Sequence, residues 1–429
     1  MFAHAGMVLG VIVLVFIIAR ALKLTTELSM FVAALAGALA HGAGIPPRHI
    51  VEGAFTYFDV TLIFLTATFF MNLLKEAGGV TFIVRGIIRR FHRYRVLTLL
   101  FLTLVMLVPG ALTGAGTVTV FVVGALVSTV LSYMGIPKER VAAIVFLCAA
   151  MSAAAPPINL WAMMTAAGSN MPYVGFFLPL GVITILGALF SVFFLGWKGK
   201  AVEPEQVLAE LPEAPAGMRS WKVALPFVVL LGLILAGRIW PWSMPILGLP
   251  LVFMIAATTV ILVSPKRLSI LKVASETVDD MLPLVGIMVV VGILVQIMAL
   301  SGARGLISLA VVTMPLLAIF ATLFLILPLS EGVLQYAAAP LLGIPLIFLF
   351  NMKGFNPIIA LAGMATMWPI GDMLPPTAVV GRAAVMVVGY KGPYYGGFVK
   401  SCAIPAAFIL MLGTLYVVLS NKLAFLIGG

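Results

Sequence analysis

The sequence predicts an all-α polytopic membrane protein that consists of two inverted repeats, each with a re-entrant hairpin and a broken transmembrane helix. Three observations lead to this prediction. Of the 429 residues, 63% are hydrophobic and 9% are charged, whereas about a quarter of the residues in soluble domains are charged. Apolar windows of membrane-spanning length follow one another along the chain. In addition, the two halves of the chain correspond in the spacing of their glycines and prolines.

Ten apolar windows have the length, roughly 17–25 residues, that crosses the hydrocarbon core as a helix. The first has no Lys or Arg before Arg20 and no small-residue cleavage site, so it is predicted to be a span and not a signal peptide. Two further windows, 96–134 and 311–350, are apolar but interrupted. The ten windows are 2–19, 28–44, 57–75, 141–170, 172–196, 221–240, 245–263, 281–300, 358–390 and 394–420.

The distribution of basic residues predicts the orientation in the membrane. If the N-terminus is outside, all but five of the 25 Lys and Arg residues are cytoplasmic, as the positive-inside rule requires. We therefore attribute the net charge of +11 to contact with the bilayer of a bacterial or archaeal cytoplasmic membrane, and expect no nucleic-acid partner. The stretch 85–95 is predicted to be a basic amphipathic arm at the inner interface. The five exceptions are Arg48, Arg238, Arg304, Lys353 and Lys422.

A polar stretch near the middle of the chain, 198–220, is predicted to be a cytoplasmic linker because it is rich in Pro and Glu and has no aromatic residue. It separates a first repeat, 1–197, from a second, 221–429. Shifting the sequence by 219 residues superimposes Gly and Pro positions of the two halves, and these matches are more informative than apolar identities in this composition. They are Pro109 with Pro328, Gly124 with Gly343, Gly135 with Gly354, and Pro156-Pro157 with Pro375-Pro376.

Counting crossings brings the hairpin windows 96–134 and 311–350 into the membrane from opposite faces, so the repeats are predicted to be inverted. The hairpins should turn within 109–120 and 328–339. Each is followed by a helix that its Pro-Pro pair breaks, 141–170 in the first repeat and 358–390 in the second. Secondary transporters place binding sites near the midplane at such breaks, and irregular backbone at membrane depth is tolerated only within protein or beside a watery cavity.

Two carboxylates in the second repeat are the leading candidates for binding a cation. Glu331 lies in the predicted hairpin and Asp372 beside the facing break, and an intramembrane carboxylate is costly and usually functional. Hard oxygen ligands suit Na⁺, although one carboxylate carrying a proton is an alternative. The full predicted cation set is Thr113, Gly114, Gly116, Ser330, Glu331, Gly332, Gly371 and Asp372.

The predicted substrate contacts are Thr117, Asn159, Gln335, Thr377 and Arg382. Structural alternatives accompany several of them. The Gly and Thr residues of the first hairpin suit close helix packing, and Asn159 and Thr377 suit capping of the half-helices that follow the prolines. Arg382 is placed to bind a substrate carboxylate bidentately, to pair with Glu331 or Asp372, or to extend to the interface.

Motifs along nearly the whole chain resemble the large membrane subunit of tripartite ATP-independent periplasmic (TRAP) transporters. They are "GALTGAGTVTV" at 110–120, "APPINL" at 155–160, "PLLGIP" at 340–345, "GFNP" at 354–357 and "LPPTAVVG" at 374–381. The resemblance implies Na⁺-driven uptake of an organic acid, a periplasmic binding protein that delivers it, a small four-span membrane subunit beside this chain, and an elevator-like movement. The Ala-rich surroundings of Pro156-Pro157 depart from the family pattern.

Two other functions are considered. A stand-alone ion-coupled carboxylate transporter of the same superfamily would work without a binding protein. An intramembrane aspartyl protease would need two neighbouring carboxylates, one of them in a Gly-x-Gly-Asp motif; residues 369–372 lack the first Gly, and the candidate partner Asp59 lies at a span end. Cys148, Cys402 and four scattered His residues predict neither a disulfide nor a metal cluster. We therefore expect a transporter and not an enzyme.

Overall fold

The computed structural model describes residues 2–200, 203–240, 243, 245 and 247–427. Within these ranges the chain is helical and contains no β-strand. Nine of the described helices are long and apolar enough to cross a bilayer, which confirms the all-α polytopic membrane fold. They are Phe2–Ala21, Pro47–Glu76, Arg95–Thr113, Gly116–Tyr133, Phe177–Gly196, Ser220–Gly237, Ile270–Leu300, Leu316–Ala337 and Tyr394–Val418.

The elements follow the predicted windows closely. The part before the linker contains α1 (Phe2–Ala21), α2 (Thr26–His41), α3 (Pro47–Phe55), α4 (Phe58–Glu76), α5 (Gly79–Phe91), α6 (Arg95–Thr113), α7 (Gly116–Thr119), the π-helix η1 (Val120–Gly124), α8 (Ala125–Tyr133), α9 (Lys138–Ala154), α10 (Leu160–Gly168) and α11 (Phe177–Gly196). The remainder contains α12 (Pro204–Glu210), α13 (Ser220–Ile239), α14 (Leu249–Val263), α15 (Ile270–Leu300), α16 (Ala303–Thr313), α17 (Leu316–Leu334), η2 (Gln335–Ala337), η3 (Ala339–Gly343), α18 (Ile344–Met352), α19 (Pro357–Met367), η4 (Trp368–Met373), α20 (Val379–Val388), η5 (Tyr394–Val399), α21 (Lys400–Val418) and η6 (Ala424–Ile427).

Local sequence sets several helix ends. The Thr25 hydroxyl caps α2 by accepting the Leu28 N–H at 3.4 Å. The helix stops before Gly42, whose φ of 85° is the left-handed conformation that glycine adopts at little cost; the predicted window 28–44 therefore ends three residues early. Gly78, at φ 82°, turns the chain from α4 into the basic arm α5 in the same way.

The elements on the two sides of the linker correspond at the 219-residue offset. The π-helices η1 and η3 are both five residues long and end at Gly124 and Gly343. The nine-residue helices α8 and α18 follow directly, and each is succeeded by a glycine with positive φ, Gly135 or Gly354. The glycine and proline spacing therefore marks a correspondence of local structure.

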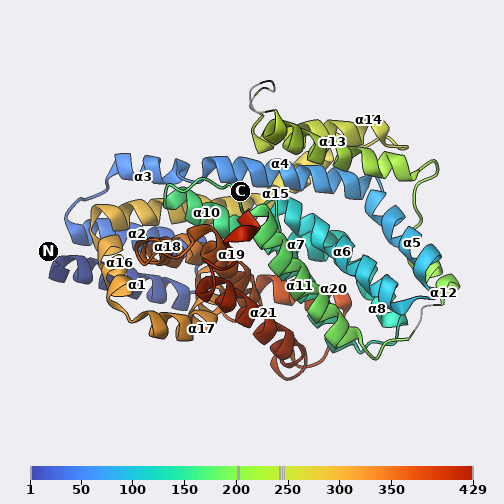
Figure 1. Cartoon of the computed structure of the whole chain (residues 1–429). Helices are drawn as coiled ribbons and strands as arrows, with labels where there is room; N and C mark the ends of the chain where they lie inside the picture. The colour runs from blue at the N-terminus through green and yellow to red at the C-terminus, as the bar shows by residue number, and fades with distance from the viewer. Residues whose placement is uncertain (1, 201–202, 241–242, 244, 246, 428–429) are drawn as a thin grey trace.

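The contacts between the helices define two groups, whose elements are labelled in Figure 1. In the scaffold group, defined as α1–α4 and α13–α15, helix α15 packs on α2, α3 and α4, and α14 packs between α4 and α13. In the central group, defined as α6–α11 and α17–α21, helix α9 packs on α6, α11, α20 and α21. Every residue from Val141 to Ala154 in α9 is buried, so this helix forms the middle of the molecule.

The two hairpins and the two half-helices exchange partners within the central group. Helix α10, which follows the first break, packs on η3 of the second hairpin, and α20, which follows the second break, packs on η1 of the first. Within each half, α17 packs on η4 and α6 packs on α9. Each break is therefore enclosed by elements from both halves of the chain.

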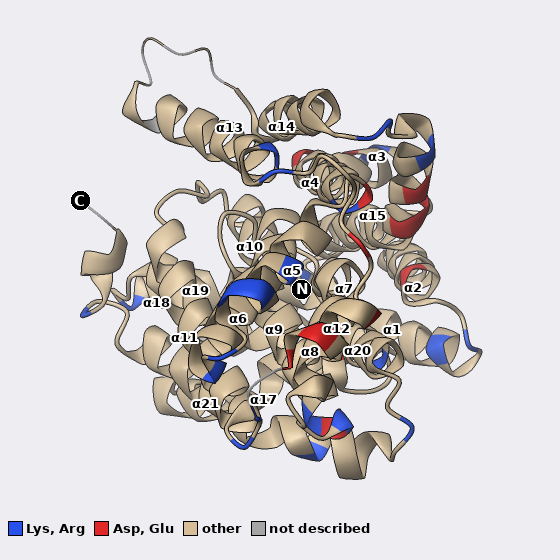
Figure 2. Cartoon of the chain, turned by 90° about the vertical axis from the view of Figure 1, so that its right-hand side faces the viewer, with Lys and Arg blue, Asp and Glu red and all other residues tan. Residues whose placement is uncertain are grey.

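The linker is more ordered than its composition predicts. Residues Pro204–Glu210 form helix α12, which packs on α5 and α8 with Val207 buried. The Arg85 guanidinium donates to the carbonyls of Leu208, Leu211 and Pro212 at 2.8–3.1 Å. Figure 2 looks onto this end of the molecule, where charged segments gather around α5 and α12. The basic arm thus holds the linker by hydrogen bonds, a role that the sequence did not predict.

Helix α15 is longer than its predicted window, 281–300. It begins at Ile270, so its first turns contain charged residues that the apolar window left out. Lys272 and Glu276 form an i,i+4 ion pair in these turns, with Nζ and Oε1 3.7 Å apart. Helix α1 begins at the end of the molecule opposite to α5 and α12 (Figure 1); the orientation of the chain in the membrane stays a prediction.

Candidate functional site

Each hairpin turns at one residue with positive φ. The first turns at Gly114, with φ 69°, between α6 and α7. The second turns at Gln335, with φ 54°, at the end of α17. Ser330, Glu331 and Gly332, predicted to form the second tip, instead lie in the last turns of α17. A helix that continues past Pro328 displaces the tip toward Gln335.

Both Pro-Pro pairs interrupt helices, as predicted. Helix α9 ends before Pro156-Pro157 and α10 begins after it, while Pro375-Pro376 separates η4 from α20. Each break is tied to the hairpin of its own half. The Ile158 N–H donates to the Ala111 carbonyl at 3.1 Å, and the Thr377 N–H and hydroxyl donate to the Gly332 carbonyl at 3.2 and 2.9 Å.

A cavity of about 520 Å³ lies where the two hairpin turns meet the second break. Four of the predicted cation and substrate residues line it: Thr117 from the first hairpin, Gln335 from the second, and Asp372 and Thr377 from the break. The scaffold group closes the other side with polar residues of α1, α2, α4 and α15. These include Arg20, Glu27, Thr68, Asn72, Lys75 and Asp280.

Arg20 and Lys75 are functional candidates that the sequence did not single out. Both appeared only as basic residues at span ends, and their position beside the cavity depends on how α1 and α4 pack. The Arg20 guanidinium also donates to the Leu24 carbonyl at 2.7 Å. Asn72 donates to the Thr277 hydroxyl at 2.9 Å, a bond between α4 and α15. The only sequence signal for Arg20 and Lys75 was their charge.

Asn159 and Arg382 do not line the cavity. Asn159 is fully buried and caps α10: its Oδ1 accepts the Ala162 N–H at 2.9 Å and its Nδ2 donates to the Ala154 carbonyl at 2.7 Å. Arg382 is exposed on α20 and forms no ion pair with any described residue. Among the described residues the structure therefore does not form the salt bridge with Glu331 or Asp372 that was one of the alternatives for Arg382. Asn159 and Arg382 both lie outside the cavity.

The protease dyad is not assembled either. Asp59 lies in the first turn of α4, where it is exposed, and it is not among the residues that surround Asp372 in the cavity. Two carboxylates that are to share a proton in peptide hydrolysis must lie side by side. The alternative of an aspartyl protease built on Asp59 and Asp372 therefore has no support in the geometry.

Glu331 is fully buried behind the cavity wall. Neither of its carboxylate oxygens has a hydrogen-bond partner in the described part of the chain, and the same is true of the Trp161 indole N–H. Glu331 lies on α17, which packs on η4, the element that contains Asp372. A buried carboxylate without a partner costs far more free energy than a neutral group, so Glu331 is a candidate for holding a cation or a proton.

The close approach of α17 to η4 brings Glu331 and Asp372 together. A Cβ atom placed on Gly371 would lie 2.8 Å from the Glu331 Cβ, and one placed on Gly332 would lie 3.0 Å from the Leu374 Cβ. Glycine at these two positions lets the helices touch backbone to backbone. The predicted cation residues Gly332 and Gly371 thus have a packing role at the contact.

The equivalent region of the first half is internally satisfied. The Thr119 hydroxyl lies 2.7 Å from the Ser152 hydroxyl and accepts the Gly110 N–H at 2.9 Å, and Ser152 donates to the Leu107 carbonyl at 2.8 Å. The hydroxyl of Thr113, a predicted cation ligand, donates to its own helix, as does that of Ser330; Gly114 and Gly116 are buried beside the turn. The two halves therefore differ in chemistry where they correspond in backbone.

Comparison with known proteins identifies the fold. No protein family and no curated protein matches the sequence. Solved structures do match the fold. One is MtrF of Neisseria gonorrhoeae, described as illuminating a class of antimetabolite efflux pumps. It gives a TM-score of 0.57 and 13% identity over 85% of this chain and 83% of that one. The YdaH transporter of Alcanivorax borkumensis, described as having an unusual topology, gives a TM-score of 0.61 and 13% identity over 89% of both chains.

The chain has a membrane-transporter fold. The expectation of a polytopic helical membrane protein agrees with this fold, whereas the transporter role and the absence of enzymatic activity stay predictions. Neither structure is described as a TRAP subunit, so membership of that family and the partners that it implies stay predictions.

Proposed function

We propose that the chain is a secondary active transporter that carries an organic acid and couples its movement to Na⁺. One observation supports this most directly: the cavity joins both hairpin turns and the second break, has basic residues at its edge, and is lined by Asp372 of η4. Helix α17 packs on η4 and carries Glu331, whose carboxylate has no hydrogen-bond partner among the described residues. Non-helical backbone beside a polar cavity at membrane depth is the usual setting of a transporter binding site.

The cavity offers two kinds of contact to an organic anion. Arg20 and Lys75 supply positive charge, and hydrogen bonds between a cation and a carboxylate are about twice as strong as neutral ones. Thr117, Gln335 and Thr377 supply uncharged polar groups on the opposite wall. We assign the carboxylate of the substrate to the basic side and the rest of the molecule to the hairpin side. The assignment replaces Arg382 with Arg20 and Lys75.

Coupling follows from the position of the acidic residues. Asp372 lines the cavity that receives the anion, and Glu331 lies close behind it. Two like charges near the substrate oppose its binding, and a cation bound between them removes this repulsion. By thermodynamic linkage the substrate then strengthens cation binding by the same factor. We propose Na⁺ as the cation, because oxygen ligands suit it; a proton on Glu331 is the alternative.

The proposed direction of access is toward the cytoplasm in this conformation. Lys75 and Asp280, at the edge of the cavity, are exposed, and the charge distribution predicts that this edge faces the cytoplasm. We propose that the two halves are inverted repeats and that the central group moves against the scaffold group. The exchange of partners between the hairpins and half-helices supports this, because both would move as one unit.

Uptake with a periplasmic binding protein and a small four-span subunit is the version that the sequence resemblance supports; a stand-alone transporter of the same superfamily would need neither. Export is the second candidate, because the fold is shared with MtrF, which is described as an efflux pump. Genes for both partners beside this one would favour the three-component form.

Reconstitution in liposomes tests the proposal. A panel of labelled mono-, di- and tricarboxylic acids is offered with an inward or outward Na⁺ gradient, or with a pH gradient alone. We expect Na⁺-dependent accumulation, reduced at least tenfold by Lys75→Gln or Arg20→Gln and little changed by Arg382→Gln. Carboxylate transport that depends on neither gradient would contradict the proposal. So would transport that is unchanged when both Arg20 and Lys75 are replaced by Gln.

A further inference from the structure

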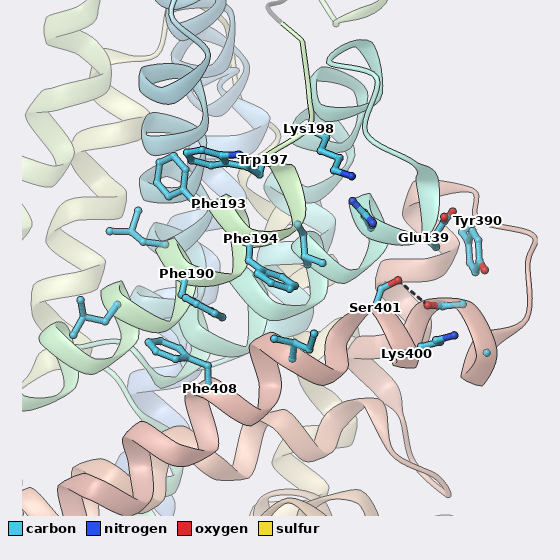
Figure 3. Close-up of a pocket in the computed structure, with 17 residues that line it drawn as sticks. Glu139, Phe190, Phe193, Phe194, Trp197, Lys198, Tyr390, Lys400, Ser401 and Phe408 are labelled. Atoms are coloured by element: carbon cyan, nitrogen blue, oxygen red, sulfur yellow. Dashed lines mark hydrogen bonds between the residues drawn. The ribbon is translucent and has the colours of Figure 1, made fainter.

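A second, larger cavity lies outside the candidate site, between α11 and α21 (Figure 3). Its volume is about 1330 Å³, above the roughly 300–1,000 Å³ that is usual for sites of small ligands. None of the residues that line it lines the transport cavity. The size and position indicate an elongated ligand that enters from the bilayer.

One end of this groove is apolar and rich in aromatic rings. The Phe190 ring stacks on Phe408 with centroids 3.9 Å apart and on Phe194 at 5.6 Å, so α11 and α21 are joined by a continuous aromatic wall. Ile404, 57% exposed, continues the surface on α21. Rings and side chains exposed on helices that cross the membrane contact lipid tails, and this wall suits an acyl chain.

The other end is basic and lies at the helix termini. Arg140 comes from the first turn of α9, Lys198 follows the end of α11, and Lys400 begins α21. Figure 3 shows Lys198 and Lys400 at the same end of the groove as Glu139. Three cations thus face one carboxylate, Glu139, and none of the four forms an ion pair with a described residue. The positive end of the α9 dipole adds to the attraction for an anion.

Two features fix this end at the membrane surface. Trp197, 67% exposed, and Tyr390 line the groove beside the cations, and Trp and Tyr are enriched at headgroup depth. The Arg95 guanidinium lies over the Trp197 ring, 5.6 Å from its centroid, and also donates to the Gly196 carbonyl at 3.0 Å. The end of α11 is thereby held in place.

We infer that this groove binds an anionic phospholipid, with the phosphate headgroup on Arg140, Lys198 and Lys400 and an acyl chain along the aromatic wall. Basic pockets between membrane helices recognise acidic headgroups in this way. The groove is apolar at one end and basic at the other. A phospholipid has the same order of parts, an apolar acyl chain followed by a charged headgroup. A soluble anion would not contact the aromatic wall. An apolar helix of another protein would leave the three cations, which form no ion pair with a described residue, without a counter-charge.

Quenching of tryptophan fluorescence by brominated lipid tests the inference on the full chain in detergent. Brominated phosphatidylglycerol and brominated phosphatidylcholine are titrated separately, and the Trp197→Phe variant identifies the signal from the groove. We expect phosphatidylglycerol to quench Trp197 at the lower concentration. Lys198→Gln and Lys400→Gln should each weaken its binding about fivefold, which corresponds to about 1 kcal/mol per lysine near an anionic lipid, and should leave phosphatidylcholine unchanged.

Lys138→Gln is the matched control, because Lys138 is exposed at the same helix end but does not line the groove. It should retain the full preference, and high salt should reduce that preference in the wild-type protein. Equal quenching by the two lipids, or an equal loss in Lys138→Gln, would overturn the inference. So would a change in oligomeric mass of the Lys198→Gln, Lys400→Gln double variant without a change in quenching, which would make the groove an interface between copies of the chain.

Discussion

Replacing Glu331 by Leu, the residue that occupies the equivalent position 112 of the first half, should raise stability and abolish coupling. Both Glu331 oxygens are buried without a hydrogen-bond partner in the described part of the chain. Each buried polar group left unsatisfied costs about 1–3 kcal/mol, and a charged one costs more. In Na⁺-free buffer the free energy of unfolding of Glu331→Leu should therefore exceed that of the wild type by about 1–3 kcal/mol, the range for such a group.

Sodium should reverse this order. A ligand that binds the native state stabilises it by about 4.1 kcal/mol at a concentration of 1,000 Kd, which exceeds the predicted difference of about 1–3 kcal/mol, and only the wild type retains the site. Denaturation in detergent is followed in NaCl and in choline chloride at equal ionic strength, so no substrate is needed. Uptake in liposomes is measured in parallel and should be lost in the variant.

The matched control is Asp59→Asn, which alters an exposed carboxylate far from the cavity lining and should change neither quantity. A Glu331→Leu protein that is less stable than the wild type without Na⁺ would show that the carboxylate is satisfied in the native state. A variant that keeps the Na⁺-dependent stabilisation would refute the coupling role. Stabilisation that depends on pH and not on Na⁺, and that the variant lacks, would identify a proton as the coupling ion.

Three further predictions concern the site and the linker. Asp372→Asn should raise the Na⁺ concentration needed for half-maximal uptake without loss of expression, whereas Arg382→Gln should leave it near normal, because Arg382 is exposed and lies outside the cavity. Gly114→Leu should abolish uptake: its Cβ would lie 2.7 Å from the Leu160 Cγ at a φ of 69°, and the left-handed conformation alone costs roughly 1–2 kcal/mol. Arg85→Ala removes three hydrogen bonds to the linker, so limited proteolysis by a Glu-specific protease should cut α12 several times faster; an unchanged cleavage rate would show that apolar packing alone holds the linker.

The sequence by itself determined where the chain crosses the membrane and where its helices break. Apolar windows of fixed length, the left-handed glycines and the Pro-Pro pairs act on neighbouring residues only, so they can be recognised without the fold. The offset of 219 residues that aligned Gly124 with Gly343 also aligned the π-helices that end at these glycines. Thr117, Gln335, Asp372 and Thr377 were identified for the same reason, since each lies beside a local break in the backbone.

Only the tertiary structure decided which side chains share a site. Arg20 and Lys75 are recognisable only as basic residues at span ends until α1 and α4 pack beside the hairpins, and Arg382 is exposed on α20 outside the cavity. Glu331 and Leu112 occupy equivalent positions. Whether a carboxylate at position 331 has a hydrogen-bond partner depends on the side chains that η4 and α10 place beside it. Burial and hydrogen bonding between distant segments depend on how helices pack in three dimensions, and no local pattern in the sequence encodes that packing.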